Sequence, residues 1–481
     1  MLGRIGNLKR TAGLNLAALL LMSLNGHAQE SDTWTLKRCI DHALESNIQI
    51  KQTKLSVDMA SANLLQSKAN LLPKVNAFAS HSYNFGRSID PFTNDFVTQR
   101  IQSNSFSISG SVTLFSGLTN YNTVKQREED LSAAKYDSDK ATNDISLAVA
   151  GNYLEILFNM ELEEVARNQV LLSMGQLERM NKLVRAGSIP RGDLLEIEAQ
   201  YSMDELQHLE SKNRWELSIL TLQQLLDLDP SQEFDIALPD MSIAEGAKVE
   251  STPGQIYDAA TAIMPEIKAA GHRLKSSEQG LAIARGSLSP TLSLGGSYGT
   301  GYSDGRSRLL NSTFNGYDTL AYTVSGEGVL FPDYQSTFET TPFSDQIKDN
   351  INQNIGFNLS IPIFNGWQSR TSIKLATIAL KNAEYEVQIQ KQQIKENIER
   401  AYLDAVAALK KFRASKRTVA SLQESFSYSK KKFDVGLITA LEFNDSKNKL
   451  AKASSELLQA KYDYLYKTKI LDYYQGNSLA F

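Results

Sequence analysis

The chain has 481 residues but only one cysteine, Cys39, and five histidines. A single cysteine cannot form a disulfide within the chain, so we expect a free and inert thiol. The four histidines beyond the N-terminal segment are scattered and never stand at the spacing of metal ligands. No P-loop and no dinucleotide-binding fingerprint occurs. These absences predict a protein that is not an enzyme and that holds no metal or cofactor.

One short motif matches an enzyme pattern. Gly301 to Gly305 fits G-x-S-x-G, which in hydrolases places a nucleophilic serine between a buried strand and a helix. Here a polar loop follows the motif, so we do not interpret it as a nucleophile elbow.

Long apolar runs are also absent beyond the N-terminus, so no transmembrane helix is predicted. The 50 basic and 54 acidic residues give a formal charge of −4, without the basic surplus of a nucleic-acid-binding protein. Residues 1–28 combine a basic start, a 13-residue apolar run from Ala12 to Leu24 and the small residues Gly26 and Ala28 before Gln29. This pattern predicts a signal peptide and an exported protein.

Proline is missing from two stretches, 118–185 and 367–434. Each predicts one helix of about 68 residues, roughly 100 Å long at 1.5 Å per residue. Helices of this length without internal caps are typical of coiled-coil packing. Gly187 and Gly436 follow them as helix breaks, and return helices are predicted over 193–227 and 441–474.

The chain also repeats itself at a constant offset of 249 residues. Phe115-Ser116-Gly117 returns as Phe364-Asn365-Gly366, and the breaks at Gly187 and Gly436 have the same separation. A constant offset over about 100 residues predicts two structurally equivalent halves. We place the first half at 29–228, a linker at 229–252 and the second half at 253–481. Further helices are expected at 36–71 and 253–288, ahead of the strands.

Four segments alternate apolar and polar residues, at about 74–85, 105–115, 291–302 and 353–364. Period-two alternation places one set of side chains on each face of a strand. Segments of about 11 residues with serine and glycine on the polar face are typical of membrane strands that face lipid and a lumen. Soluble half-buried hairpins are the alternative. The Gly-, Ser-, Asp- and Asn-rich segment around 304–352 is expected to be an exposed loop.

Four membrane strands cannot close a barrel, because the smallest closed transmembrane barrels have about eight. An open sheet edge cannot remain in lipid. The pattern therefore demands more than one chain, and two or three copies would satisfy it. The expected fold is mostly α with a β part: an internally duplicated protomer of long antiparallel coiled-coil helices with four antiparallel strands.

The ordered combination of these features resembles the TolC-like outer-membrane efflux family along nearly the whole mature chain. It rests on the duplication, the two strand pairs, the strand-to-helix turns at Phe115, Gly117, Phe364 and Gly366, and the two helix breaks. The resemblance implies a homotrimer whose twelve-stranded barrel lies in outer-membrane lipid and continues as a helical tunnel in the periplasm. It also implies an exit duct of a tripartite efflux or type I secretion system, served by a periplasmic adaptor and an inner-membrane pump.

The resemblance further assigns a gate to the segment that begins at Val435. Asp193, Glu442 and Asp445 fall where the family places an acidic constriction. Carboxylates of three chains crowded together would attract cations. The alternative is that acidic residues in a first helical turn only complement the helix dipole.

The same resemblance places adaptor docking at Gly187, Gly436 and Leu437. Ile438 stands where some members have a gate-locking arginine. Arg191 is a hypothetical substitute for that arginine.

A periplasmic coiled-coil scaffold or adaptor without a membrane barrel is the competing hypothesis. Adaptors, however, place one hairpin between split β domains and lack two strand pairs. The cargo, whether small molecules or proteins, is chosen by the pump and is not encoded in a wide tube, which has no substrate pocket.

Overall fold

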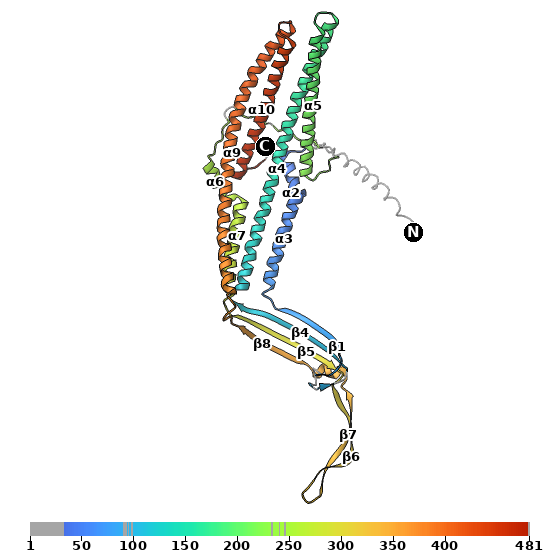
Figure 1. Ribbon diagram of the computed structural model, residues 1–481. Helices are drawn as coiled ribbons and strands as arrows, with labels where there is room; N and C mark the ends of the chain where they lie inside the picture. Colours follow the sequence, from blue (N-terminus) through green and yellow to red (C-terminus); the bar gives the residue numbers. More distant parts are fainter. Residues whose placement is uncertain are drawn as a thin grey trace, which may run out of the picture. The chain divides into compact units, whose positions relative to one another are not determined.

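The computed structural model describes residues 33–89, 94, 96–97, 100–231, 234–239, 241–244 and 247–479 (Figure 1). The expected signal peptide therefore lies outside the described residues. The first half contains helices α2 (Leu36–Ser46), α3 (Ile48–Ala69), α4 (Thr119–Arg185) and α5 (Arg191–Leu225), and strands β1 (Lys74–Asn84), β2 (Ser88–Ile89), β3 (Phe96–Val97) and β4 (Ile101–Ser116). The second half contains α6 (Pro253–Ile263), α7 (Pro265–Gly286), β5 (Thr291–Ser303), β6 (Ser307–Tyr322), β7 (Gly328–Thr340), α8 (Phe343–Asp349), β8 (Asn352–Ser360), α9 (Gln368–Asp434) and α10 (Ala440–Gln475).

The two halves have equivalent long helices. Helices α4 and α9 each contain 67 residues, and both begin and end within one residue of the predicted bounds. Each is followed by a return helix of similar length, 35 residues in α5 and 36 in α10. Within the described residues, none of the helices combines the length and apolar character that crossing a bilayer requires.

The described residues form two compact units. The helical unit contains residues 33–57, 134–269 and 387–479, and the sheet unit contains residues 58–133 and 270–386. Helices α4 and α9 each contribute to both units, and the C-terminal ends of these helices belong to the helical unit, whereas the sheet belongs to the other.

The sheet unit is built on a four-stranded antiparallel sheet with the order β1-β4-β5-β8. The register places Val112 beside Leu294, and Leu294 beside Phe357. These residues and those that alternate with the same phase form one largely apolar face, to which β1 contributes Val75 and Ala77. Serine, glycine and asparagine dominate the other face: Ser107, Ser109, Ser111, Ser293, Gly295, Ser297, Asn354, Gly356 and Asn358. The predicted alternation thus resolves into two distinct faces of one sheet.

Among the residues that the structure describes, neither edge strand of this sheet, β1 or β8, has a further partner strand. All nine residues of β8 are exposed, and so are ten of the eleven residues of β1. Ile355, Phe357 and Leu359 on β8 are between 58% and 79% exposed. The unpaired backbone groups of an edge strand can pair with another strand. The exposed apolar side chains beside them are suited to a lipid environment, in which such an edge must be paired.

The strand-to-helix turns have the same backbone in both halves. Gly117 and Leu118 both have positive φ, and so do Gly366 and Trp367. Two successive left-handed residues reverse the chain between a strand and the next helix, and glycine adopts the first position without a steric penalty. The turn residues that the sequence singled out therefore form equivalent turns, 249 positions apart.

The core of the helical unit surrounds Tyr153 on α4, which is fully buried. Its hydroxyl donates a hydrogen bond of 2.6 Å to the carbonyl of Ala237 in the linker. Cys39 packs in the same core as a free, fully buried thiol, and burial raises its pKa to about 12. The cysteine is therefore a free and buried thiol, and its low reactivity stays a prediction.

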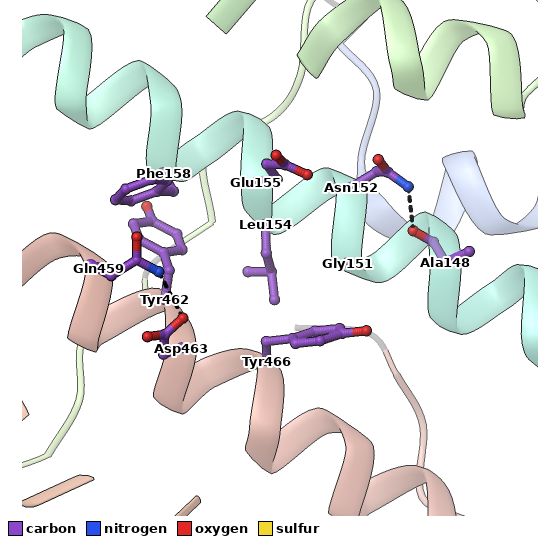
Figure 2. Close-up of a pocket in the computed structure, with 10 residues that line it drawn as sticks. All are labelled: Ala148, Gly151, Asn152, Leu154, Glu155, Phe158, Gln459, Tyr462, Asp463 and Tyr466. Atoms are coloured by element: carbon purple, nitrogen blue, oxygen red, sulfur yellow. Dashed lines mark hydrogen bonds between the residues drawn. The ribbon is translucent and has the colours of Figure 1, made fainter. Parts of the chain in front are cut away.

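A cleft of about 450 Å³ lies where α4 passes α10 in this unit (Figure 2). Its lining is mixed, with Glu155 and Asp463 beside Phe158 and Tyr466. Gly151 makes room for the Tyr466 ring, because a Cβ at Gly151 would lie 3.2 Å from the ring. The cleft is a consequence of helix packing, and no cluster of catalytic groups converges in it.

Two predicted helices are each broken in the structure. The helix expected over 36–71 is divided at Asn47, whose side-chain oxygen accepts hydrogen bonds from the backbone N–H groups of Gln49 and Ile50. It thereby caps the start of α3. The helix expected over 253–288 is divided at Met264 by Pro265, which cannot donate to the preceding turn and instead begins a new helix.

The segment 304–352 is not the irregular loop that the composition predicted. It contains the hairpin β6–β7 and the short helix α8. The hairpin was missed because three bulges, near Leu310, Asn315 and Leu320, each shift the alternation by one residue. The strand expected over 353–364 also ends earlier, at Ser360, ahead of Pro362.

Candidate gating tip

The tips of the two helical hairpins have matching backbone geometry. Gly187 has φ +71° and Gly436 has φ +79°. After Gly187, the N–H of Ser188 donates to the carbonyl of Leu183, and after Gly436, the N–H of Leu437 donates to Lys432, both at 2.9 Å. This is the glycine-terminated helix end in which a left-handed residue satisfies the last carbonyls. The glycines therefore stop α4 and α9 at the same point of each repeat.

Glu442 is fixed at the start of α10 by a capping box with Thr439. The backbone N–H of Thr439 donates to the Glu442 carboxylate at 2.9 Å, and the N–H of Glu442 donates to the Thr439 hydroxyl at 3.2 Å. This reciprocal pair holds the Glu442 carboxylate at the tip surface while Phe443, the next residue, is 1% exposed. Phe443 stacks on Phe433 with ring centroids 4.6 Å apart, so the end of α9 and the start of α10 pack together.

The other two predicted gate acids lie near the starts of α5 and α10 but differ in burial and contacts. Asp193 lies half-buried in the first turn of α5, and Asp445 is exposed on α10, where it pairs with Lys449 at 2.6 Å. Asp193 and Glu442 line one cleft of about 520 Å³ between the two hairpin tips. Arg191 is the exposed first residue of α5.

An ion pair at the tip was missed in the sequence. Arg179 on α4 donates to a carboxylate oxygen and to the backbone carbonyl of Asp434, the last residue of α9. It joins the two hairpins of one chain, and both side chains are about 40% exposed (37% and 41%). The partners are 255 positions apart, and no motif links them in the sequence.

A second polar cluster, also missed, lies further down the same bundle. Lys447 on α10 is only 1% exposed, yet its ammonium group donates to Asp204 on α5 and, at 2.6 Å, to Ser173 on α4. Gln200 donates to the second Asp204 oxygen at 2.8 Å. Burial lowers the pKa of Lys447, because desolvation outweighs the attraction of Asp204. We call Lys447, Asp204 and Ser173 the buried triad.

The ion pair at the tip gives a testable prediction. Replacing Arg179 with glutamine removes a half-exposed pair, which is worth at most about 1 kcal/mol. If the two tips must separate for the channel to open, the open fraction should rise up to about fivefold. Single-channel recording in planar bilayers measures this. Arg185→Gln, in the exposed last turn of the same helix, is the matched control, and equal effects of both variants would contradict the role of the pair.

The fold indicates the class of protein to which the chain belongs. A duplicated chain of long helical hairpins, attached to an open-edged sheet with one apolar and one Ser/Gly/Asn face, is an outer-membrane export channel. The family model for outer membrane efflux proteins matches residues 39–227 and 256–476. The chain belongs to this family of channel proteins, and its helical part lies in the periplasm.

Individual relatives are distant but are matched over most of their length. The chain is 21% identical to the outer membrane protein TolC of Escherichia coli, over 94% of this chain and 84% of TolC. It is 22% identical to the alkaline protease secretion protein AprF of Pseudomonas aeruginosa, over 85% of this chain and 77% of AprF. The solved CmeC outer membrane channel of Campylobacter jejuni has the same fold, with a TM-score of 0.71, 17% identity and coverage of 92% of this chain and 85% of CmeC.

These findings decide between the hypotheses drawn from the sequence. The family match includes both halves with their strand pairs, which a periplasmic scaffold without membrane strands would not contain. The protein is an outer-membrane exit channel.

Proposed function

We propose that three copies of the chain close a twelve-stranded barrel in the outer membrane, since three times four strands gives twelve. The observation that carries the proposal is the open-edged sheet. Strand β8 of one copy would pair with β1 of the next, which removes every unpaired edge. The apolar face with Ile355, Phe357 and Leu359 would meet lipid. The Ser/Gly/Asn face would line the lumen.

We propose that the helical hairpin tips dock a periplasmic adaptor, which connects the duct to an inner-membrane pump. Val435, Leu437 and Leu441 are between 66% and 73% exposed around Gly436. Exposed apolar residues at a helix break are suited to receive the hairpin tip of a partner. The duct itself is a passive conduit, and the pump supplies the energy and selects the cargo. Among the relatives, AprF is named for the secretion of a protease and BepC of Brucella suis for efflux.

We further propose that Asp193, Glu442 and Asp445 of the three copies form the acidic constriction of the closed channel. Glu442 and Asp445 are exposed at the start of α10, and Asp193 lines the same cleft as Glu442. Crowded carboxylates favour cations. Arg191, exposed on the neighbouring helix end, is a candidate latch to an acid of an adjacent copy.

Neutralising the acids tests both the duct and its constriction. Asp193→Asn and Asp445→Asn should lower the cation selectivity of the channel, because each removes three negative charges from the trimer. Glu442→Gln retains the oxygen that the cap requires and should lower selectivity without loss of fold. Reversal potentials across bilayers with a salt gradient measure this.

Glu424→Gln on α9, outside the tip segment, is the control for these variants. A channel without cation preference, or one unchanged by all three neutralisations, would contradict the constriction. The absence of any conductance from the wild type would contradict the duct.

A further inference from the structure

The hairpin β6–β7 has one aromatic face. Strand β7 is regular, so its even-numbered residues share one side, and the pairing places Leu309, Phe314 and Tyr317 on that side with Leu330, Tyr334 and Phe338. The Phe314 ring contacts Tyr317 and Tyr334, with centroids 5.2 Å and 5.6 Å apart. Each bulge in β6 adds one residue to that strand, and the residues after it then point to the opposite face from the one that strict alternation would give. This change of phase places Phe314 and Tyr317 on the same face as Leu309. We call these six residues the aromatic face.

The opposite face is mostly polar and charged. Arg308 pairs across the strands with Glu339 at 2.7 Å, and Gln335 lies opposite Thr313. Charged and amide side chains of this kind remain in water. The hairpin is therefore amphipathic, although none of the described elements covers its apolar side.

The aromatic face is a large apolar patch for a solvent-exposed surface. Each of its six side chains is more than half exposed, from 52% for Phe314 to 65% for Tyr317. Together they leave roughly 600 Å² of apolar surface uncovered, on typical areas for such side chains. The largest apolar patch on a typical monomer measures about 300–600 Å² and is often functional, so the aromatic face lies at the upper end of that range.

The base of the hairpin is anchored to the sheet. Gln346 on α8 is fully buried, donates to the carbonyls of Ser303 and Thr341 at 2.8 Å each, and accepts from the N–H of Ser303 at 2.9 Å. Ser303 ends β5 and Thr341 follows β7, so one side chain fixes both ends of the hairpin. A two-stranded ribbon is only marginally stable by itself in water, so a partner that covers its aromatic face would stabilise it.

The position of the hairpin indicates the partner. It leaves the sheet at the end of β5 that is distant from the α7 connection (Figure 1), and therefore on the extracellular side. It also precedes β8, the edge strand that must pair with another copy. In an assembly closed by these edges, every copy presents the same aromatic face at the same rim, at a high effective concentration.

We propose that the aromatic faces of the β6–β7 hairpins pack against one another between copies of this chain, above the outer mouth of the channel. This inference rests on the proposed trimer. The three hairpins form an extracellular collar that bears its polar faces to water.

Cross-linking tests the collar in the full-length channel. Tyr334→Cys places a thiol on the aromatic face, and Gln335→Cys places one on the polar face of the same strand. The natural Cys39 is present in both variants, but it is buried and should not react. Oxidation, or a short bis-maleimide, should give covalent dimers from Tyr334→Cys, because one accessible thiol per chain can link only two chains. Gln335→Cys and the wild type should give only monomer on denaturing gels.

The native mass of each variant, measured first in mild detergent, separates the two proposals. A trimer in which Tyr334→Cys fails to cross-link, or in which both variants cross-link equally, overturns the collar and leaves the trimer intact. A single-chain mass overturns both. If reconstitution into lipid vesicles protects the thiol of uncross-linked Tyr334→Cys trimers from a water-soluble maleimide, lipid covers the face and the collar is overturned.

Discussion

Replacing Lys447 with methionine is expected to lower the free energy of unfolding of the helical unit by about 3–5 kcal/mol, because Asp204 would remain as a buried charge without its partner. Lys447 is 1% and Asp204 is 8% exposed, so water cannot replace the lost ammonium group. Thermal unfolding of the detergent-extracted protein, followed by the helical circular dichroism signal, measures the loss.

The double variant Lys447→Met with Asp204→Leu provides the sharper comparison. Removing both charges leaves an apolar contact of similar volume, which is often neutral or stabilising. The double variant should therefore recover most of the stability lost by the single one. Lys449→Met, two residues away, breaks only an exposed pair with Asp445 and should cost at most about 1 kcal/mol. Equal losses from Lys447→Met and Lys449→Met would contradict the importance of burial.

The second large effect is expected at Gly117. A Cβ at this position would lie 2.5 Å from the carbonyl oxygen of Gly286 and 2.5 Å from the Cβ of Ser289, and φ is +61°. The left-handed backbone costs an L-residue about 1–2 kcal/mol, and the clash with a neighbouring backbone adds roughly 1–3 kcal/mol. Gly117→Ala should therefore destabilise the sheet unit by about 2–5 kcal/mol.

The internal repeat supplies the control for this variant. Gly366 has the same conformation, with φ +63°, but no atom within 4 Å of a Cβ. Gly366→Ala should cost only the backbone term, about 1–2 kcal/mol. Thermal unfolding and the yield of assembled channel measure both variants. Similar losses would show that backbone strain alone governs these turns and that the contact of Gly117 with Gly286 is unimportant.

The comparison of these glycines shows what a repeat does and does not predict. The offset of 249 residues identified both turns, because each needs a left-handed glycine. It could not show that the end of α7 crowds the Cβ position of Gly117 and not that of Gly366, since that contact depends on how distant segments pack. Local backbone requirements, such as a left-handed glycine, can be predicted from the sequence, whereas the tertiary contacts of a residue cannot.

The same division applies to the candidate site. The glycine ends of α4 and α9 and the first-turn acids were predictable, since helix termination has local signals. The buried triad was not, because Lys447 and Asp204 are 243 positions apart and a lysine on a long charged helix is usually solvated. Thr439 and Glu442 show the spacing of a capping box in the sequence, and that signal could have revealed the structural role of the Glu442 carboxylate.

The β6–β7 hairpin shows how a strand signal is lost. Alternation is read at a fixed period of two, and each of the three bulges reverses its phase. The Gly-, Ser- and Asn-rich composition then favoured a loop. The strand pairing, which the sequence alone does not give, sorts the residues of this segment onto one aromatic and one polar face.

The most direct test of the central claim is the native mass of the protein extracted from the outer-membrane fraction in mild detergent. The four-stranded sheet with two unpaired edges requires more than one copy, and the proposed twelve-stranded barrel predicts a complex of three chains, in which β8 of each copy pairs with β1 of the next. A monomer that dissolves in water without detergent would contradict the account, because a sheet with open edges cannot remain in lipid.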